Sequence, residues 1–176
     1  HPYPYPMTEP EFWDDDQTGM VNETFESPVV NFKNLHVLTD YFQQAHMRTA
    51  GGQVRHIILS EEGFTSDSIS RGKVYDIQAF AYAYYLVDNN PYIDAFILNR
   101  QVDAITEVET SCAFGLWTVD MSRPDKVIAV MPKNIYQVFK HIDTRKSLRY
   151  SEFAKSIVGI SDWSEVIPGF DPEKYQ

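Results

Sequence analysis

The stretch His56-Ile57-Ile58-Leu59-Ser60 is the part of the sequence that decides the fold class. It is an apolar run between glycines, too short for a helix, and it therefore predicts a buried strand. The run Ile93-Asp-Ala-Phe-Ile-Leu98 predicts a second buried strand, and residues 74–89 between the two predict a helix. A helix between two apolar strands is typical of a βαβ unit, so we predict an α/β fold whose parallel strands have helices outside.

The segments on either side of this unit show weaker patterns. Residues 31–50 have apolar side chains at helical spacing and predict a helix, with Asn31 as its cap and Gly51-Gly52 as its stop. Residues 99–131 predict a long loop with a short extended piece at 114–119. A further helix is expected to start at Pro132, because proline is favourable in a first helical turn. The tail, residues 150–176, predicts one short helix and an ordered loop.

Composition excludes several classes of protein. The chain has 176 residues, 25 acidic and 15 basic, and a formal net charge of −10, so nucleic acid is not an expected partner. No apolar run approaches the roughly 18–20 residues of a membrane helix. A single cysteine, Cys112, excludes an internal disulfide framework and a multi-cysteine metal site. The acidic run Asp14-Asp15-Asp16 lacks the alternating spacing of a calcium loop, so no metal is expected.

Nothing in the sequence indicates a bound cofactor. Neither GxGxxG nor the P-loop pattern occurs, so nucleotide binding has no support. GxSxG is also absent, which disfavours a serine hydrolase.

Polar residues follow both predicted strands, and ligands of parallel α/β folds bind at the carboxyl ends of strands. Ser60-Glu61-Glu62-Gly63 follows the first strand, and Asn99-Arg100-Gln101-Val102-Asp103 follows the second. A carboxylate held there is well placed for general acid–base or nucleophilic work, and a neighbouring arginine such as Arg100 would keep it ionised. A glutamate in such a loop also caps helices or pairs with surface lysines, and the local pattern leaves both interpretations open.

The string Ile57-Ile-Leu-Ser60-Glu61-Glu62-Gly63-Phe64 resembles the strand-seven signature of retaining glycoside hydrolases in the large (β/α)8 barrel clan. More narrowly, the chain resembles an uncharacterised bacterial family of glycoside-hydrolase-like barrels. The matching pieces span nearly the whole chain: His1-Pro-Tyr-Pro, Ser60 to Ser66, Gln78-Ala79, Asp94 to Leu98 with Arg100 and Asp103, Phe114 to Trp117, and Phe139 to Thr144.

The resemblance implies an activity and a set of site residues. Glu61 matches the nucleophile of a retaining hydrolysis of O-glycosidic bonds in a polysaccharide or oligosaccharide. The residues that the resemblance places near the substrate are His1, Tyr3, Glu62, Arg100, Asp103 and Trp117. Within that set, Trp117 is the candidate platform on which a sugar stacks, and His1 and Tyr3 match the end of strand six.

The second catalytic carboxylate is missing from the expected position. A retaining glycosidase needs two carboxyl groups about 5–5.5 Å apart. In the clan the acid/base glutamate follows an asparagine at the end of strand four, whereas Asn22-Glu23 lies in an irregular leader. A barrel also needs about 200–250 residues. The resemblance therefore implies that residues 1–176 are one α/β unit, the C-terminal part of a (β/α)8 TIM barrel from about strand six to strand eight.

Two consequences and one alternative follow. The acid/base would come from a missing N-terminal half, and that half or self-association would cover the exposed strand edges. A signal for secretion or for the bacterial cell envelope would lie outside this chain, so no location is assigned. The alternative is a non-catalytic carbohydrate-binding or structural α/β module that has kept the barrel and lost the paired acids.

Overall fold

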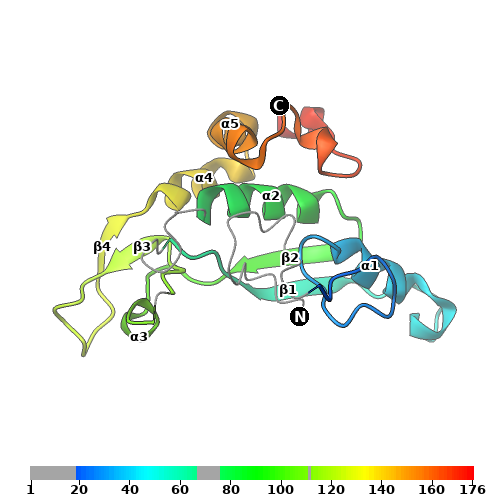
Figure 1. Ribbon diagram of the computed structural model, residues 1–176, viewed down its shortest axis with the longest axis horizontal. Coiled ribbons are helices and arrows are strands. Elements are labelled where there is room, and N and C mark those ends of the chain that lie inside the picture. The colour runs from blue at the N-terminus through cyan, green and yellow to red at the C-terminus, as the bar shows by residue number, and fades with distance from the viewer. Residues whose placement is uncertain (1–18, 67–75, 111) are drawn as a thin grey trace.

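A computed structural model of the chain describes residues 19–66, 76–110 and 112–176, with residues 76–79 described by their backbone alone. In chain order the helices and strands are α1 (Leu35–Gln43), η2 (Ala45–Met47), β1 (Ile57–Glu62), α2 (Asp76–Asp88), β2 (Ile93–Leu98), α3 (Ile105–Val108), β3 (Trp117–Val119), β4 (Ala129–Pro132), α4 (Asn134–Ile142), α5 (Ser147–Val158), η3 (Trp163–Glu165) and η4 (Pro172–Tyr175). Figure 1 shows α2, α4 and α5 above the strands, with α3 and the β3–β4 hairpin beyond the end at which β1 and β2 point.

The predicted parallel pairing is confirmed. β1 pairs with β2 in parallel through the α2 crossover, and β3 pairs with β4 antiparallel in a separate sheet. The second strand has the predicted bounds, and the first extends two residues further than expected, through Glu62. Each sheet contains two strands within the described ranges, and no barrel is seen there.

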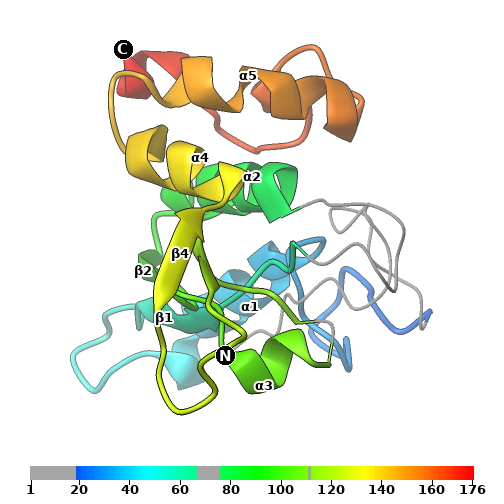
Figure 2. The same cartoon turned by 90° about the vertical axis from the view of Figure 1, so that its left-hand side faces the viewer.

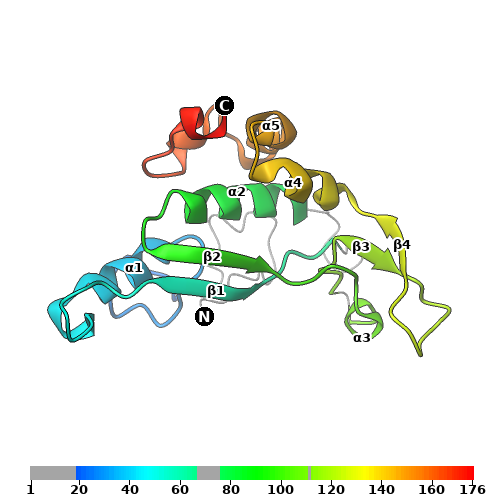
Figure 3. The same ribbon diagram turned by 180° about the vertical axis from the view of Figure 1, so that it is seen from behind.

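The core lies on the face of the β1–β2 sheet that the helices cover. Leu59 of β1 is fully buried, and the ring of Phe96 in β2 lies 6.0 Å from Phe80 of α2 and 6.2 Å from Phe32, just before α1. Offset and edge-to-face aromatic pairs of this kind add to the stabilisation from apolar burial. The opposite face of the sheet, seen from behind in Figure 3, is not covered by α1 or α2, and it leaves Ile58 and Ile97 about half exposed, at 56% and 51%.

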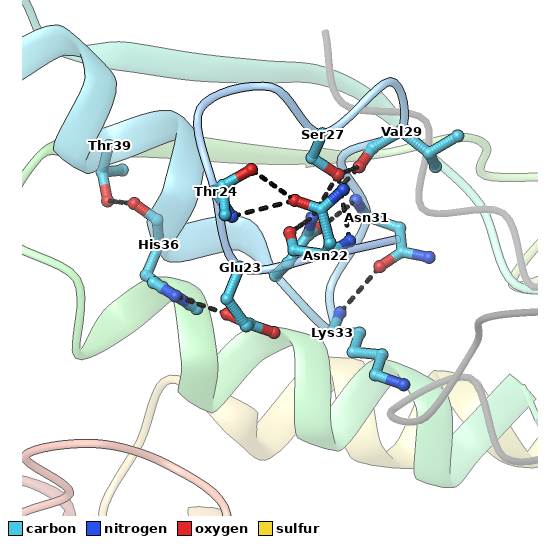
Figure 4. A network of polar contacts seen from close by, with 10 residues as sticks. Asn22, Glu23, Thr24, Ser27, Val29, Asn31, Lys33, His36 and Thr39 are labelled. Carbon is cyan, nitrogen blue, oxygen red and sulfur yellow. Dashed lines mark hydrogen bonds and ion pairs between the residues drawn. The ribbon is translucent and has the colours of Figure 1, made fainter. Parts of the chain in front are cut away.

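The helix predicted over residues 31–50 is shorter than expected, and Asn31 is not its cap. The α-helical part runs from Leu35 to Gln43, and Asn34 precedes it. Asn34 is fully buried, and its side-chain amide donates to the carbonyls of Asn22 and Val29 and to Ser27 Oγ. Its Oδ1 accepts the backbone N–H of Asn31. Figure 4 shows four of its partners, Asn22, Ser27, Val29 and Asn31, close together in this loop. One side chain therefore organises the loop before α1.

We expect Asn34→Ala to lower the free energy of unfolding by about 2–3 kcal/mol, because it leaves the buried N–H of Asn31 without its acceptor and removes the amide donor from the partly buried carbonyls of Asn22 and Val29. The matched control is His36→Ala in the same network, where His36 forms an exposed pair with Glu23 at 2.7 Å, worth roughly 0–1 kcal/mol. Urea titration measures both variants. Equal effects of the two substitutions would contradict the organising role of Asn34.

The C-terminal half differs from the sequence prediction in three places. Residues 99–131 contain a helix and most of a hairpin, α3 and β3–β4, where a loop with one extended piece was expected. Pro132 ends β4, so α4 begins at Asn134 instead. α5 starts at Ser147, where the Tyr85 hydroxyl contacts the hydroxyls of Ser147 and Ser151, each at 2.7 Å. This buried contact holds α5 against α2. Figure 2 shows α5 lying above α4 and α2.

Candidate functional site

Glu61 and Glu62 lie at the carboxyl end of β1 in opposite environments. The β1–β2 register shifts between Leu59 and Glu62, where three steps along β1 match two steps along β2. Such a bulge re-aims the side chains that follow it. Strict alternation from Leu59 would bury Glu61, but the bulge leaves Glu61 exposed and buries Glu62 instead. The strand therefore presents one carboxylate outward and places the next in the interior.

Glu62 is a buried, unpaired carboxyl group. Its side chain is fully buried, and neither carboxyl oxygen has a hydrogen-bond partner among the residues that the structure describes. Burial raises the pKa of Glu62 from its usual 4.5 to about 8, and the charge of Glu61 acts in the same direction. Glu62 is therefore mostly protonated at neutral pH, and in this structure it does not face solvent as a substrate-binding residue would.

Arg100 follows β2 at the same end of the sheet. The backbone N–H of Asn99 donates to the carbonyl of Glu62 at 2.6 Å. Arg100 is the next residue in the chain, so its backbone lies close to the end of β1. The guanidinium of Arg100 forms an ion pair with Glu107 of α3 at 2.5 Å. The pair is incomplete, because Arg100 Nε and Glu107 Oε2 are buried without partners in the described part of the chain.

Asp103 belongs to a hydrogen-bonded cluster around Lys133. Asp103 Oδ1 accepts the backbone N–H of Gly115 at 2.7 Å and the Lys133 ammonium at 2.8 Å. Lys133 Nζ also donates to Ser66 Oγ and to the Ala113 carbonyl, each at 2.9 Å. An ammonium has three N–H donors, so all of them are used. These five residues form the Lys133 cluster, which joins the loops after β1 and β2 to the start of α4.

Gly115 is required for this close approach. A Cβ atom at residue 115 would lie 2.2 Å from the backbone nitrogen of Asp103 and 2.6 Å from the carbonyl carbon of Val102. Because these are backbone atoms, they cannot move aside as the flexible end of a side chain could, so only glycine fits at position 115. The segments 100–103 and 115–117 therefore run side by side, and the backbone of Trp117 bonds to Gln101 and Asp103.

A cavity of about 710 Å³ opens beside the end of β2. Trp117 lines it, half buried, with its ring centroid 5.4 Å from that of Tyr136 on α4. Arg100 and Gln101 supply polar groups, and Phe96 and Phe139 extend the aromatic wall. The structure thus brings together two of the predicted substrate residues, Arg100 and Trp117, around a hollow large enough for a sugar unit.

The remaining predicted residues divide into two groups. His1, Tyr3 and Asp14-Asp15-Asp16 lie outside the described residues. Asn22-Glu23 is a loop pair whose Glu23 contacts His36, so it is not at a strand end. Sequence reasoning missed Lys133, Glu107 and Tyr136. The partners of Lys133 are 67, 30 and 20 residues away, so no local pattern identifies it.

The described ranges hold no group of three or more histidine, cysteine or acidic side chains placed to bind a metal ion. No helix among them is both long and apolar enough to cross a membrane. Cys112 is a free, partly buried thiol whose sulfur contacts the carbonyl of Thr110.

The fold and site define a mixed α/β protein with polar side chains gathered at the carboxyl ends of two parallel strands. A sequence profile described as a family of unknown function, DUF5722, matches residues 1–166. The chain belongs to this family. No curated protein and no solved structure matches the chain.

Proposed function

We propose that the chain carries the nucleophile of a glycoside-hydrolase-like enzyme that cleaves O-glycosidic bonds by a retaining mechanism. Glu61 attacks the anomeric carbon, the glycosidic oxygen leaves with a proton from a second carboxyl group, and water then hydrolyses the glycosyl-enzyme ester. One observation carries this proposal: the bulge in β1 turns Glu61 outward at the carboxyl end of a parallel strand, where a rigid ladder holds it.

The neighbouring acid does not serve as the partner of Glu61. A retaining pair needs both carboxyl groups in contact with the substrate, about 5–5.5 Å apart. Glu62 is fully buried, so the acid/base comes from outside the described residues. Glu62 instead remains protonated inside the strand end, where it adds no second charge beside the nucleophile.

The sheet is in our proposal a section of a (β/α)8 barrel. β1 and β2 are parallel and are joined by a helical crossover, α2. One face of their sheet leaves Ile58 and Ile97 about half exposed. In a barrel that face is filled by side chains from the other strands, and parallel sheets are normally covered on both faces. The remaining strands and the acid/base then belong to a further part of the protein.

The test is the substitution Glu61→Gln in the full-length natural protein. Removing the nucleophile is expected to lower hydrolysis of a glycan substrate by about 10³-fold or more, equivalent to about 4 kcal/mol of barrier. Glu109→Gln, an exposed glutamate at the end of α3, is the matched control and should keep full activity. Full activity in Glu61→Gln would refute the assignment, and a loss confined to Glu62→Gln would transfer the role to Glu62.

A second candidate function is carbohydrate binding without turnover. The aromatic wall of Trp117 and Tyr136 favours it, since sugars present an apolar face to aromatic rings. Measured glycan binding with no detectable hydrolysis by the full-length protein would select this function over the enzyme.

A further inference from the structure

The free edge of β2 lies along an apolar groove. β1 pairs with one edge of β2, and no strand among the described residues pairs with the other edge of β2 between its two ends. A groove of about 390 Å³ runs the length of the strand, from Ile93 to Leu98, and β1 contributes nothing to its lining. Ala95 and Phe96 both line it. Because successive side chains of a strand point to opposite faces, a groove lined by both follows the edge of the strand.

The wall opposite the strand is apolar and comes from two helices. The rings of Phe80 on α2 and Phe139 on α4 lie 5.8 Å apart between centroids, and Ile142 of α4 continues the wall. Phe80 and Ile142 are buried, whereas Phe139 is 42% exposed. An unpaired edge presents a row of backbone N–H and C=O groups to which another strand can bond. A strand that adds to β2 would also bury alternate apolar side chains against α2 and α4.

The amino end of the groove is acidic. Asp88 ends α2 and Asp94 is the second residue of β2, so both lie where the strand begins. Asp143 follows α4, and the hydroxyl of Tyr84, one helical turn before Asp88, donates to its carboxylate at 3.1 Å. No lysine or arginine is among the described residues that line the groove. A segment that docks here therefore meets three carboxylates and no basic side chain in the lining.

Two of these carboxylates are available to a cation from the docked segment. The Lys174 ammonium already pairs with Asp88 at 2.8 Å. Asp94 contacts the imidazole of His56 and Asp143 accepts from a neutral hydroxyl, and neither has a lysine or arginine partner in the described part of the chain. Complementary charges across an interface select and orient the partner. The segment that fits the groove is therefore apolar along its length and basic at the end near Asp94 and Asp143.

We propose that the free edge of β2 binds a parallel strand from the further part of the protein, with apolar side chains toward α2 and α4 and a lysine or arginine at its start. A parallel strand begins beside the start of β2, where the acidic end of the groove lies. This inference rests on the proposed function, in which β1 and β2 are a section of a barrel. It adds the edge that is extended and the charge of the strand that extends it.

Photo-cross-linking in the full-length protein identifies the occupant of the groove. Phe139→p-benzoylphenylalanine keeps an aromatic ring on the groove wall and adds a reactive ketone. Phe153 of α5 is also 42% exposed and lines neither this groove nor the cavity beside β2, so Phe153→p-benzoylphenylalanine is the matched control. Irradiation is expected to join residue 139, within one chain, to a peptide from outside residues 1–176, and mass spectrometry should identify an apolar strand preceded by a lysine or arginine. The control should not yield that peptide.

Three results of the cross-linking would each overturn the proposal. A product of twice the mass would mean that a second copy fills the groove. A cross-link to a segment without a basic residue would remove the charge complementarity. The absence of any cross-link at residue 139 would mean that the edge of β2 stays open.

Hydrogen exchange of the amides of residues 93–98 tests the charges separately. The double variant Asp94→Asn with Asp143→Asn removes two charges from the groove and keeps hydrogen-bond acceptors there. Asp40→Asn with Asp125→Asn removes the same net charge from exposed sites outside the groove. At low salt the first double variant is expected to exchange these amides about 10-fold faster than the wild type, because the strand docks less firmly, and the second should match the wild type. Equal exchange in the two double variants would contradict the role of Asp94 and Asp143.

The outcomes also separate this inference from the proposed nucleophile. A basic strand on β2, with hydrolysis that does not depend on Glu61, keeps the interface and removes the nucleophile. Hydrolysis that depends on Glu61, with no such strand on β2, keeps the enzyme and removes the interface.

Discussion

Replacing Lys133 by methionine is expected to lower the free energy of unfolding by about 3–5 kcal/mol, because it leaves the Asp103 carboxylate buried without its counter-charge. Asp103 and Lys133 side chains are 5% and 10% exposed, and water cannot replace the ammonium well. The same change also removes the bonds from Lys133 to Ser66 and Ala113. Methionine keeps most of the side-chain volume, so the effect reports charge and hydrogen bonds.

Urea unfolding of Lys133→Met and of Lys140→Met measures this effect. Lys140 lies on the exposed face of α4, and its substitution should change the free energy by less than about 0.5 kcal/mol. The double variant Asp103→Asn with Lys133→Met should recover part of the loss, since it removes the stranded charge. Similar small effects of both lysine substitutions would show that the Lys133 cluster does not stabilise the loops after β1 and β2.

Replacing Glu62 by glutamine is expected to change how stability depends on pH. The pKa of Glu62 is raised from 4.5 in the unfolded chain to about 8 in the fold, so its neutral form favours folding. This contribution is fully present below pH 4.5 and is lost as the pH rises through about 8. The whole loss is on the order of 5 kcal/mol, at 1.36 kcal/mol for each pKa unit. Glutamine cannot ionise, so the variant does not suffer this loss.

The comparison is the free energy of unfolding of the wild type and Glu62→Gln from pH 5 to pH 9. The difference between the two proteins should grow in favour of the variant as the pH rises, while their other titrating groups cancel. Glu109→Gln, an exposed glutamate at the end of α3, is the control, and it should retain the pH dependence of the wild type. A constant difference between wild type and Glu62→Gln across this range would contradict the burial of an unpaired carboxyl.

The strands were predictable because their sequences are short, nearly continuous apolar runs. The run His56–Ser60 and the run 93–98 carry enough apolar residues to specify buried strands without knowledge of their partners, and the helix between them makes a parallel pairing necessary. The hairpin was not predictable, because all residues of β4 are exposed. Its apolar side chains therefore do not alternate between a buried and an exposed face, which is the pattern that predicts a half-buried strand. The start of α4 was misplaced because Pro132 suits the end of an edge strand as well as a first helical turn.

The site was predictable only as a location. A carboxylate at a strand end follows from the sequence, but which of Glu61 and Glu62 turns outward depends on a bulge against β2, and that is a property of two strands together. For Asp103 the resemblance predicts substrate contact, and the structure shows this carboxylate bonded to Lys133 and Gly115, residues that only the fold brings together. Arg100 and Trp117 both line the cavity beside β2, and their contact with a substrate stays a prediction. The sequence did not indicate that Glu107 pairs with Arg100.

Covalent trapping of the nucleophile tests the central claim most directly. The full-length protein is incubated with 2-deoxy-2-fluoro glycosyl fluorides of gluco, galacto and manno configuration, in both anomeric forms, and the peptide containing Ser60-Glu61-Glu62 is fragmented by mass spectrometry. A retaining mechanism through Glu61 predicts a glycosyl ester on Glu61 for at least one reagent, and none in Glu61→Gln. A label on Glu62 or on another residue, or hydrolysis of a glycan substrate with no trapped ester, would contradict the account.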